Sequence, residues 1–489
     1  MDPHQATRKK IFLPKLYALL KLPYHYALAF LGAVIFGFPS RKLNVIAVTG
    51  TKGKSSVVEL VSAILEEAGF ATALANTIRF KIRDDSRRNT YKMTMPGRFF
   101  LQSFLRKAVK AGCTHVVLEM TSEGARQFRH KFIALDALIF TNLAPEHIES
   151  HGSYENYVAA KVSLARALEK SREKSLPLIP PFLKEVPESA RAEDFTTPQS
   201  PPLKGGEEIP RPSATPFRKG RIEKILVVNG DDKEAQKFLD AFSGTKIVYS
   251  KKDAGNPGIS SEGVSFDWDG IRINSKLPGE FNLYNILAAT TFAKAIGVPL
   301  EQIRSGIKKV TSIAGRVERI TLDEHPTPTL PSKEGREQPS SLDFIVIVDY
   351  AHTPDSLEKL YQTYAGKYRI CVLGNTGGGR DTWKRPVMAG IAEKYCDEVI
   401  LTNEDPYDED PEKIIREMAA GMKSKRPTLI MDRREAIRAA LQKAGKGDVV
   451  LISGKGTDPF IMGAKGSKEP WDDAAVVREE LAALLAKRQ

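Results

Sequence analysis

The order of apolar and polar positions along the chain predicts an α/β protein with largely parallel sheets. Short apolar, β-branched runs alternate with segments whose apolar residues recur at helical spacing. The first run covers residues 44–48 and precedes a helical pattern that starts at Ser55. Because parallel strands direct their carboxyl ends to one edge of a sheet, ligands are expected at that edge. Further strands are predicted at residues 114–119, 137–142, 225–229, 246–249, 344–349, 368–373, 398–401 and 448–452.

This alternation divides the 489 residues into three parts. We predict an apolar and basic helical segment over residues 1–43, a nucleotide-binding domain over 44–312, and a Rossmann-like doubly wound domain over 313–489. Residues 175–220 and 323–342 are rich in Pro, Ser, Lys and Glu. Such segments cannot bury enough apolar surface to order themselves, so both are predicted to be disordered surface insertions.

The turn between the first strand and its helix has the composition of a phosphate-binding loop. Glycines allow backbone N–H groups to approach phosphate oxygens, and a helix N-terminus favours negative charge. Lys54 would place its charge on the β- and γ-phosphates, and the Ser55 hydroxyl would bind Mg²⁺. The residues predicted to hold the nucleotide are Gly50, Thr51, Lys52, Gly53, Lys54, Ser55 and Ser56.

A carboxylate at the end of the next predicted strand, Glu119, is a candidate ligand for the same ion, because Mg²⁺ prefers oxygen ligands. A strand-terminal glutamate is more often simply solvated. Its position in a phosphate-loop domain reverses that preference. Taken alone, His147, His151 and Lys161 would be assigned to the surface.

Two further segments of interest lie in the C-terminal half. Residues 349–355 follow a strand, and a run of glycines at 377–379 precedes the cations Arg380, Lys384 and Arg385. Glycines followed by cations suggest a phosphate or oxyanion contact. Together with a phosphate loop, these segments predict a site that closes between two domains.

Composition narrows the possible partners. The net charge of +13 suits an anionic ligand or a membrane surface, but no Arg/Lys-rich stretch with interleaved aromatic residues is present. We therefore expect no nucleic-acid partner. Cys113, Cys371 and Cys396 are far apart in sequence and form no Cys-x-x-Cys pair, which favours a reducing compartment and argues against a cysteine-based zinc site.

Residues 11–38 are apolar and aromatic, but Lys21, Pro23 and His25 interrupt them. The uninterrupted part is shorter than the ~20 residues that span a bilayer, and no cleavage site follows it. Two interpretations remain: helices packed on the first domain, which we favour, and peripheral contact with the inner face of the membrane, assisted by the neighbouring basic residues.

The assembled motifs resemble those of the Mur ligases, the ATP-dependent amide-forming enzymes of peptidoglycan precursor synthesis. They are most similar to those of the UDP-N-acetylmuramoyl-tripeptide synthetases. The resemblance runs from about residue 44 to the C-terminus. Its motifs are residues 49–55, 118–122, 141–152, 157–161, 279–285, 315–318, 349–355, 378–381 and 384–386.

This resemblance implies an enzyme that phosphorylates a substrate carboxylate with ATP and then admits an amino acid to form an amide. It implies use of two Mg²⁺ ions, with Ser55, Glu119, His147 and a carbamylated Lys161 as metal ligands. The catalytic residues would be Lys54, Lys161, His352, Arg380 and Lys384. Asn282, Asn285, Arg316 and Asp349 would join the phosphate loop in holding the nucleotide. The substrates would contact Thr94, Met95, Ser122, Arg129, Arg380, Asp405, Tyr407, Gly454 and Asp458.

Three departures from the family pattern affect the substrates, and one of them is that the late Gly-Lys-Gly-His-Glu motif is here Gly454-Lys455-Gly456-Thr457-Asp458. The tripeptide synthetases carry a uridine-binding domain before the phosphate loop, where this sequence has 43 apolar and basic residues, so recognition of UDP is left open. The Asp-Asn-Pro-Arg motif of diaminopimelate-adding members is here Glu404-Asp405-Pro406-Tyr407, which lacks the arginine that can clamp a carboxylate. The amino acid is left open as well.

Two other functions are compatible with these motifs. One is a related ligase with another acceptor, resembling a folylpolyglutamate or poly-amino-acid synthetase. The other is a non-catalytic ATP-binding scaffold at the membrane, which the intact metal and phosphate residues disfavour.

Overall fold

The computed structural model describes residues 23–146, 148–174, 217–218, 221–321, 343–379 and 381–488. These residues form two compact units. The first contains residues up to 257, with 265–274 and 282–310, and the second contains 258–264, 275–281 and 311 onward. Almost all of the two predicted insertions lies outside the described residues. Two short strands, β7 (Phe217–Arg218) and β8 (Arg221–Ile222), occur at the end of the first of them.

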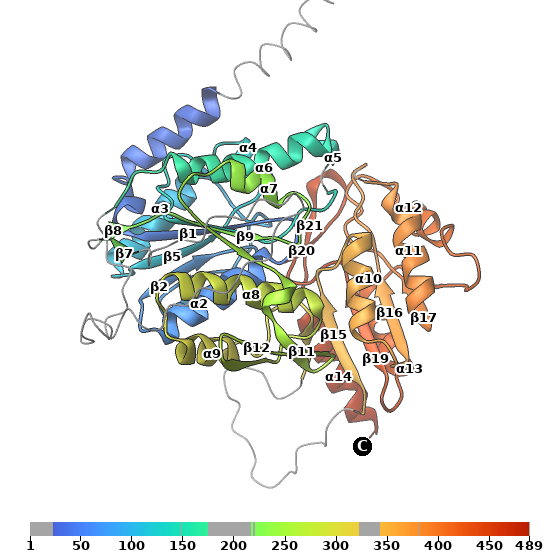
Figure 1. The fold of residues 1–489 in the computed structure, drawn as a ribbon. Coiled ribbons are helices and arrows are strands. Elements are labelled where there is room, and N and C mark those ends of the chain that lie inside the picture. The colour runs from blue at the N-terminus through green and yellow to red at the C-terminus, as the bar shows by residue number, and fades with distance from the viewer. Residues whose placement is uncertain are drawn as a thin grey trace, which may run out of the picture. The chain divides into compact units, whose positions relative to one another are not determined.

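An eight-stranded sheet organises the first unit, in the order β10-β9-β6-β1-β5-β2-β3-β4 (Figure 1). Pairing is parallel from β10 to β2, and β3 and β4 continue it as an antiparallel hairpin. The central strands are apolar on both faces because helices cover both sides of a parallel sheet. The strands are β1 (Asn44–Thr49), β2 (Thr72–Ala75), β3 (Arg79–Ile82), β4 (Asp85–Arg88), β5 (His115–Glu119), β6 (Ala137–Phe140), β9 (Ile225–Asn229) and β10 (Thr245–Tyr249).

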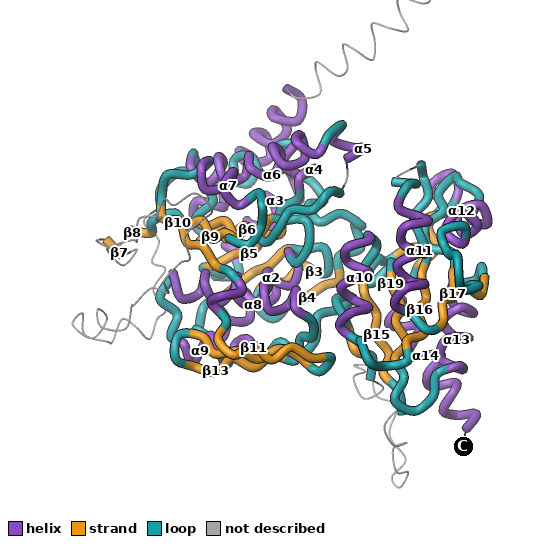
Figure 2. The backbone as a smooth tube through the Cα atoms, turned by 45° about the vertical axis from the view of Figure 1, so that its right-hand side comes forward, coloured by secondary structure: helices purple, strands orange, loops and turns teal. Residues whose placement is uncertain are grey.

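Helices lie on both faces of this sheet in both views (Figures 1 and 2). One core cluster joins a face of the sheet to α3 (Arg98–Lys110), α4 (Ser122–Arg126), α6 (Tyr154–Glu169) and α7 (Ala235–Asp240). On the other side lie α2 (Lys54–Glu67), α8 (Glu280–Ala295) and α9 (Leu300–Lys309). A helix over residues 23–35 is followed by η1 (Pro39–Lys42), and α5 (Ile148–His151) precedes α6.

A three-stranded sheet, β11-β12-β13, is divided between the two units: β11 (Gly255–Ser260), β12 (Gly263–Trp268) and β13 (Ile271–Ser275). A short 3-10 turn, η4 (Lys251–Asp253), precedes it. None of the helices within the described ranges is long and apolar enough to cross a membrane.

The second unit contains a six-stranded sheet in the order β14-β15-β19-β16-β17-β18, parallel except for β14. One core cluster lies between this sheet and α10, α11 and α12, and another between the sheet and α13 and α14. This is the doubly wound arrangement predicted from the sequence. Its strands are β14 (Glu318–Arg319), β15 (Ile345–Asp349), β16 (Arg369–Leu373), β17 (Glu398–Leu401), β18 (Thr428–Leu429) and β19 (Val449–Ser453).

Helices α10 to α13 alternate with these strands, as Figure 2 shows. A small hairpin, β20–β21, and then α14 follow β19 (Figure 1). The bounds of these helices, of the hairpin strands and of the short 3-10 turn between them are α10 (Pro354–Thr363), α11 (Lys384–Tyr395), α12 (Pro411–Ala419), α13 (Arg433–Lys443), β20 (Phe460–Met462), η5 (Ala464–Gly466), β21 (Lys468–Pro470) and α14 (Asp473–Arg488).

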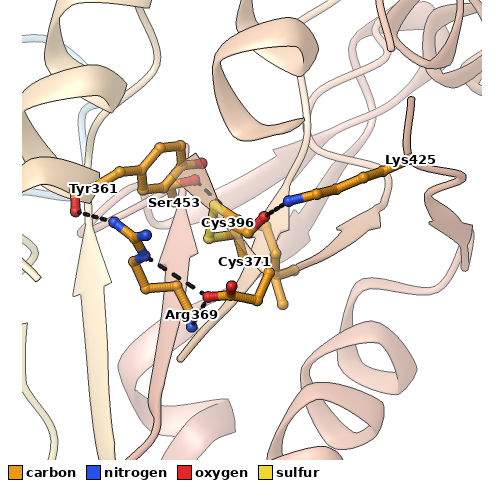
Figure 3. Close-up of a disulfide and its surroundings, with 8 residues drawn as sticks. Tyr361, Arg369, Cys371, Cys396, Lys425 and Ser453 are labelled. Atoms are coloured by element: carbon orange, nitrogen blue, oxygen red, sulfur yellow. Dashed lines mark hydrogen bonds and ion pairs between the residues drawn. A yellow bond between two sulfur atoms is a disulfide. The ribbon is translucent and has the colours of Figure 1, made fainter. Parts of the chain in front are cut away.

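Cys371 and Cys396 form a disulfide inside the second unit (Figure 3). Cys371 lies on β16, and Cys396 ends α11 just before β17, the neighbour of β16. Both cysteines are buried, and the Lys425 ammonium donates to the Cys396 carbonyl at 2.6 Å. Wide spacing in the sequence therefore does not keep these cysteines apart, and the spacing argument for a reducing compartment fails. Cys113 is buried and unpaired.

Candidate active site

The predicted phosphate loop occupies the sharp connection between β1 and α2. Gly50 and Gly53 have φ angles of 152° and 82°, in the range that favours glycine. A Cβ atom on Gly50 would collide with the Thr141 hydroxyl, and one on Gly53 would collide with the Asn285 side chain. Glycine is therefore required at both positions, and the backbone lies close to its surroundings, as a cradle for phosphate needs.

The second half of the loop is the part directed to a ligand. The Thr51 and Lys52 amides already donate to Asn142, at 2.8 Å to its carbonyl and 2.9 Å to its side chain. The first helical hydrogen bond of α2 runs from the Val57 amide to the Gly53 carbonyl. The amides that begin α2 thus have no acceptor within the helix, and they carry the positive end of its dipole.

Ser55 and Glu119, the two residues expected from the sequence to bind Mg²⁺ beside this loop, contact each other. Strand β5 pairs with β1 so that Val48 lies opposite Glu119. The Ser55 hydroxyl donates to Glu119 at 2.7 Å, and the Lys54 ammonium lies 3.8 Å from the same carboxylate. A buried hydroxyl and a buried carboxylate in contact are a donor set that suits Mg²⁺.

Sequence reasoning missed a third member of this group, Thr77. Its amide donates to Glu119 at 3.0 Å, its hydroxyl donates to the same carboxylate at 3.1 Å, and it shares a 2.7 Å hydrogen bond with Thr94. A chain of contacts therefore runs from Ser55 to Thr94. The sequence signal for Thr77 is its position just after β2, a strand that pairs with β5. That strand has only four residues, most of them small, so its apolar pattern is weak.

Lys161 is buried on α6, and its ammonium donates to the Gly50 carbonyl at 2.6 Å. Its nitrogen also lies 5.0 Å from the centre of the Tyr157 ring. Burial, followed by the repulsion of Lys54, lowers the pKa of Lys161 well below its ordinary value. Lys161 is therefore an interior lysine beside the phosphate loop, and not the solvated lysine that its position on a helix suggests.

The metal-directed set is incomplete among the described residues. His147 lies outside them, and within the described part of the chain no three His, Cys, Asp or Glu residues form a metal-binding group. His151 is described: its ring makes a 3.1 Å hydrogen bond with Ser122.

The predicted acceptor contacts gather next to the Glu119 group. Arg129 donates to the Met95 carbonyl and, at 2.8 Å, to Gln127. Met95 is buried under α4, the helix that begins at Ser122. Thr94 is linked to Glu119 through Thr77. Thr94, Met95, Ser122 and Arg129 thus lie in one region of the first unit.

The two asparagines of α8 are buried, and Asn285 donates to Asn282 at 2.9 Å. Because the Asn285 side chain touches Gly53, this pair borders the phosphate loop. The sequence motif placed both residues on the nucleotide, and the structure brings them to the predicted loop.

In the second unit, Asp349 ends β15 and His352 follows it, while Arg316 precedes β14, the antiparallel neighbour of β15. Asp349 accepts the Val317 and Ala351 amides, each at 2.7 Å, so its carboxylate braces two loops. Arg316 lies over the Tyr350 ring at 4.6 Å. The His352 ring makes a 2.6 Å contact with the Tyr350 carbonyl.

The run of glycines at residues 377–379 lies shortly before α11. Lys384 is buried at the first position of that helix, whereas Arg380 lies outside the described residues. Arg385 is almost fully buried and pairs with Glu409 at 2.9 Å and Glu417 at 2.6 Å. Arg385 therefore anchors the loops internally.

The loops after β17 and β19 form a buried charged cluster. The Lys455 ammonium contacts Asp405 at 2.8 Å and Asp458 at 3.3 Å, and the Met462 amide also donates to Asp405 at 2.8 Å. Asp405 thus holds the hairpin β20–β21 in place. Lys455 was not singled out from the sequence, since a lysine in a glycine-rich loop is usually solvated.

Glu404 and Tyr407 frame this cluster. Glu404 is buried, accepts the Thr376 hydroxyl at 2.8 Å, and has a second oxygen with no partner among the described residues, directed at Gly454. Burial raises the pKa of Glu404. Tyr407 has a φ of 52° and packs beside Gly378. Side chains that could recognise a small substrate are therefore concentrated at these strand ends.

A sheet edge with a glycine cradle, a helix N-terminus and a hydroxyl–carboxylate pair defines a phosphate-loop nucleotide-binding enzyme of the α/β class. Models of two protein families match this chain. The Mur ligase middle domain matches residues 48–186 and 214–293, and the Mur ligase glutamate ligase domain matches residues 336–456.

Relatives support the same assignment. A UDP-N-acetylmuramyl-tripeptide synthetase of Roseiflexus sp. (strain RS-1) is 33% identical over 94% of this chain and 82% of its own length. A solved UDP-N-acetylmuramoyl-L-alanyl-D-glutamate–2,6-diaminopimelate ligase superposes with a TM-score of 0.54 at 26% identity, over 91% of this chain and 79% of that one. The folylpolyglutamate synthase of Mycobacterium tuberculosis shares the fold, with a TM-score of 0.62 at 16% identity, over 91% of this chain and 96% of that one. The chain belongs to the Mur ligase family and is an ATP-dependent ligase that forms C–N bonds.

Proposed function

We propose that this ligase adds an amino acid to the carboxylate of a UDP-N-acetylmuramoyl-dipeptide-like acceptor, in the synthesis of peptidoglycan precursors. ATP would phosphorylate that carboxylate, and the amine would then attack the acyl phosphate to give the amide, ADP and phosphate. The observation that carries the proposal is the continuous path from the phosphate loop through Ser55, Glu119 and Thr77 to Thr94. It joins the expected ATP site to the expected acceptor site.

The residues of the loop fit a nucleotide and its magnesium. Gly50, Gly53 and the start of α2 would cradle the phosphates with Thr51, Lys52 and Ser56, while Asn282 and Asn285 would border the nucleotide. Lys54 would balance the negative charge. Ser55 would hold one Mg²⁺ ion, and Glu119, which contacts Ser55, would join His147 and Lys161 around a second ion. Both ions would neutralise charge on the phosphoryl oxygens.

We further propose that Lys161 is carbamylated. Burial lowers the pKa of Lys161, which favours the neutral amine, the form that adds CO₂. The product is an anionic oxygen ligand in place of a cation.

Lys161→Ala is therefore expected to lose activity, and a short-chain carboxylate or bicarbonate should restore part of it by supplying the missing oxygen ligand. Activity would be followed as phosphate release. Full activity of the variant without any additive would contradict the role of Lys161.

In the second unit, we assign Arg316 and Asp349 to the nucleotide and His352, Arg380 and Lys384 to stabilising the charge that develops during transfer. Asp405, Tyr407, Gly454 and Asp458 would recognise the amino acid. Support comes from the positions of Asp349, His352, Asp405, Tyr407, Gly454 and Asp458, which lie at the ends of the parallel strands β15, β17 and β19 or on the loops that follow them.

Three broader proposals complete this function. The domains are residues 44–312 for ATP binding and 313–489 for the C-terminal ligase domain, after an N-terminal segment over 1–43. The reaction takes place in the cytoplasm, where ATP is available. Residues 11–38, of which 23–38 are described, bring the enzyme to the inner face of the membrane.

The decisive experiment measures phosphate release from ATP by the purified chain. UDP-N-acetylmuramoyl-dipeptide would be supplied with each candidate amino acid in turn, including lysine and diaminopimelate, and products would be identified by mass. A tripeptide product is expected and would name the amino acid. Turnover only with a folate or poly-amino-acid acceptor would show that the enzyme acts on that acceptor and not on the muramoyl dipeptide. ATP binding without any turnover would indicate a non-catalytic scaffold. Glu119→Gln, which is close in shape but uncharged, is the matched inactive control.

A further inference from the structure

The helix over residues 23–35 exposes an apolar face to solvent. Residues 22–40 include no Asp, Glu, Lys or Arg. One side of the helix is buried on the first unit through Ala29, Gly32 and Ala33, and Gly32 faces the backbone of Arg98 and Phe99. The opposite side carries large apolar side chains that are each 47–60% exposed: Tyr24, Tyr26, Phe30, Leu31, Val34 and Ile35.

This face differs from that of an ordinary surface helix. A helix at the surface of a globular protein normally presents polar or charged residues to water. Single exposed apolar residues are common, but a contiguous group of them marks an interaction site. The helix is also held in place, because Tyr26 and Phe30 pack against Phe132 with ring centres 5.2 and 5.3 Å apart. The helix that carries the apolar face is therefore packed onto the first unit.

Unpaired cations border the same surface. Helix α3 carries four basic residues and no acidic one. Three of these, Arg106, Lys107 and Lys110, line a cavity of about 420 Å³ together with Val34, Ile35 and Phe36. Among the described residues, none of the three forms an ion pair. An uncharged apolar helix beside solvated cations has the composition of a segment that lies in the interface of a membrane.

We propose that residues 23–36 and the basic end of α3 form a docking surface for a bilayer that contains anionic lipids. The apolar side chains would enter the boundary between headgroups and acyl chains, while Arg106, Lys107 and Lys110 contact lipid phosphates. This inference specifies the partner in the membrane contact proposed above, and it is independent of the ligase chemistry.

Charge argues against the other possible occupants. A second copy of the chain would bring the same three cations to the interface. Residues 1–22 would bring Arg8, Lys9, Lys10, Lys15 and Lys21 against a single acid, Asp2. Either occupant would place like charges together in a partly desolvated contact, whereas an anionic bilayer neutralises them.

The test is co-sedimentation of the full chain with vesicles of phosphatidylcholine and phosphatidylglycerol, compared with phosphatidylcholine alone. Binding to the anionic vesicles and its weakening by salt are expected. Each cation near the surface contributes roughly a fivefold change in partition, so R106Q/K107Q/K110Q should reduce binding roughly a hundredfold. The matched control K423Q/R426Q/K446Q removes three exposed cations of the second unit and should bind like the unmodified chain.

The apolar half of the surface needs its own variant. Leu31→Ser with Ile35→Ser should abolish vesicle binding while the unfolding temperature changes little, since both side chains are exposed. A polarity-sensitive fluorophore on Leu31→Cys should report an apolar environment only when anionic vesicles are added.

Several results would overturn the proposal. These are equal binding to neutral vesicles, binding unchanged in both surface variants, or a fluorophore already shielded in the free protein. Shielding lost on dilution would show a self-interface, and shielding independent of concentration would show cover by the chain itself. Ligase activity on soluble substrates is measured in parallel. Vesicle binding without turnover would contradict the ligase function alone. Turnover without vesicle binding would contradict this surface and the membrane contact, and would leave the ligase function intact.

Discussion

At the scale of single residues, the centre of the candidate site is a set of short polar contacts in a buried setting. Glu119 is nine-tenths or more buried and accepts hydrogen bonds from Ser55 and from Thr77. Each contact orients the carboxylate, because a buried acid keeps its position only when its oxygens are bonded. Residues that touch no substrate can therefore influence how well a metal ion is held.

Thr77→Val tests this positioning role. The change keeps the shape and the backbone amide but removes the hydroxyl that links Glu119 to Thr94. We expect the Mg²⁺ concentration needed for half-maximal activity to rise about tenfold, in line with other residues that orient metal ligands. Thr77→Ser, which retains the hydroxyl, should behave like the unmodified enzyme. An unchanged Mg²⁺ requirement in the valine variant would contradict the role.

A buried histidine gives the first unit a pH-dependent stability. Burial lowers the pKa of His115 from 6.5 to about 3. The unfolded chain therefore takes up a proton below pH 6.5 that the folded chain refuses, so stability falls as the pH decreases from 6.5 toward 3. The slope from His115 should be about 1.4 kcal/mol per pH unit.

Denaturant unfolding at several pH values measures this slope. His115→Gln should remove the contribution of His115 and leave that of His130, which is also buried with a pKa of about 3. Equal slopes in the variant and the unmodified chain would show that His115 does not contribute.

At the scale of elements, the strand ends bring together residues that lie far apart in the chain. Parallel pairing of β1 with β5 aligns Val48 with Glu119. Pairing of β16 with β17 similarly brings the end of α11 next to β16, which allows Cys371 and Cys396 to bond. In both cases the register of a parallel sheet sets the contact.

The disulfide should stabilise the second unit. It closes a segment of 25 residues, which restricts the unfolded chain and contributes about 3 kcal/mol. Cys396→Ala should therefore lower the free energy of unfolding by about that amount under non-reducing conditions.

A reductant supplies the control for this prediction. It should destabilise the unmodified chain and leave Cys396→Ala unaffected. If the reductant changed neither protein, the bond would not be formed in solution.

At the scale of the whole molecule, the two units have separate cores. One cluster fills a face of the first sheet, and two others lie on the two faces of the second sheet. A unit with its own hydrophobic core tends to unfold cooperatively. We therefore expect two unfolding transitions in denaturant, one for each unit. Reduction of the disulfide should move the transition of the second unit.

Nucleotide should stabilise the unit that contains the phosphate loop. At a free Mg²⁺–ATP concentration about a hundred times its Kd, the free energy of unfolding should rise by about 2.7 kcal/mol. Hydrogen exchange of the β1 and β5 amides would measure this gain, and Lys54→Ala is the control that should lose it. A gain of equal size in that variant would place the nucleotide elsewhere.

Local patterns in the sequence were enough to predict the fold class, the family resemblance, and Ser55 and Glu119 as Mg²⁺ ligands beside the phosphate loop. These follow from local signals, namely apolar periodicity, a glycine turn before a helix, and an acid at a strand end. Sheet pairing then supplies the register that brings Ser55 and Glu119 into contact.

The contacts of Thr77, the environment of Lys161, the internal ion pairs of Arg385 and Lys455, and the disulfide became apparent only in the three-dimensional structure. The cause is the same in each case. Burial and partners depend on which loops the sheet brings together, and a side chain that is solvated in isolation gains its pKa and its contacts from residues remote in sequence. The exposed apolar face of the helix over 23–35 is a further instance, because periodicity alone does not show which side of an uncharged helix is covered.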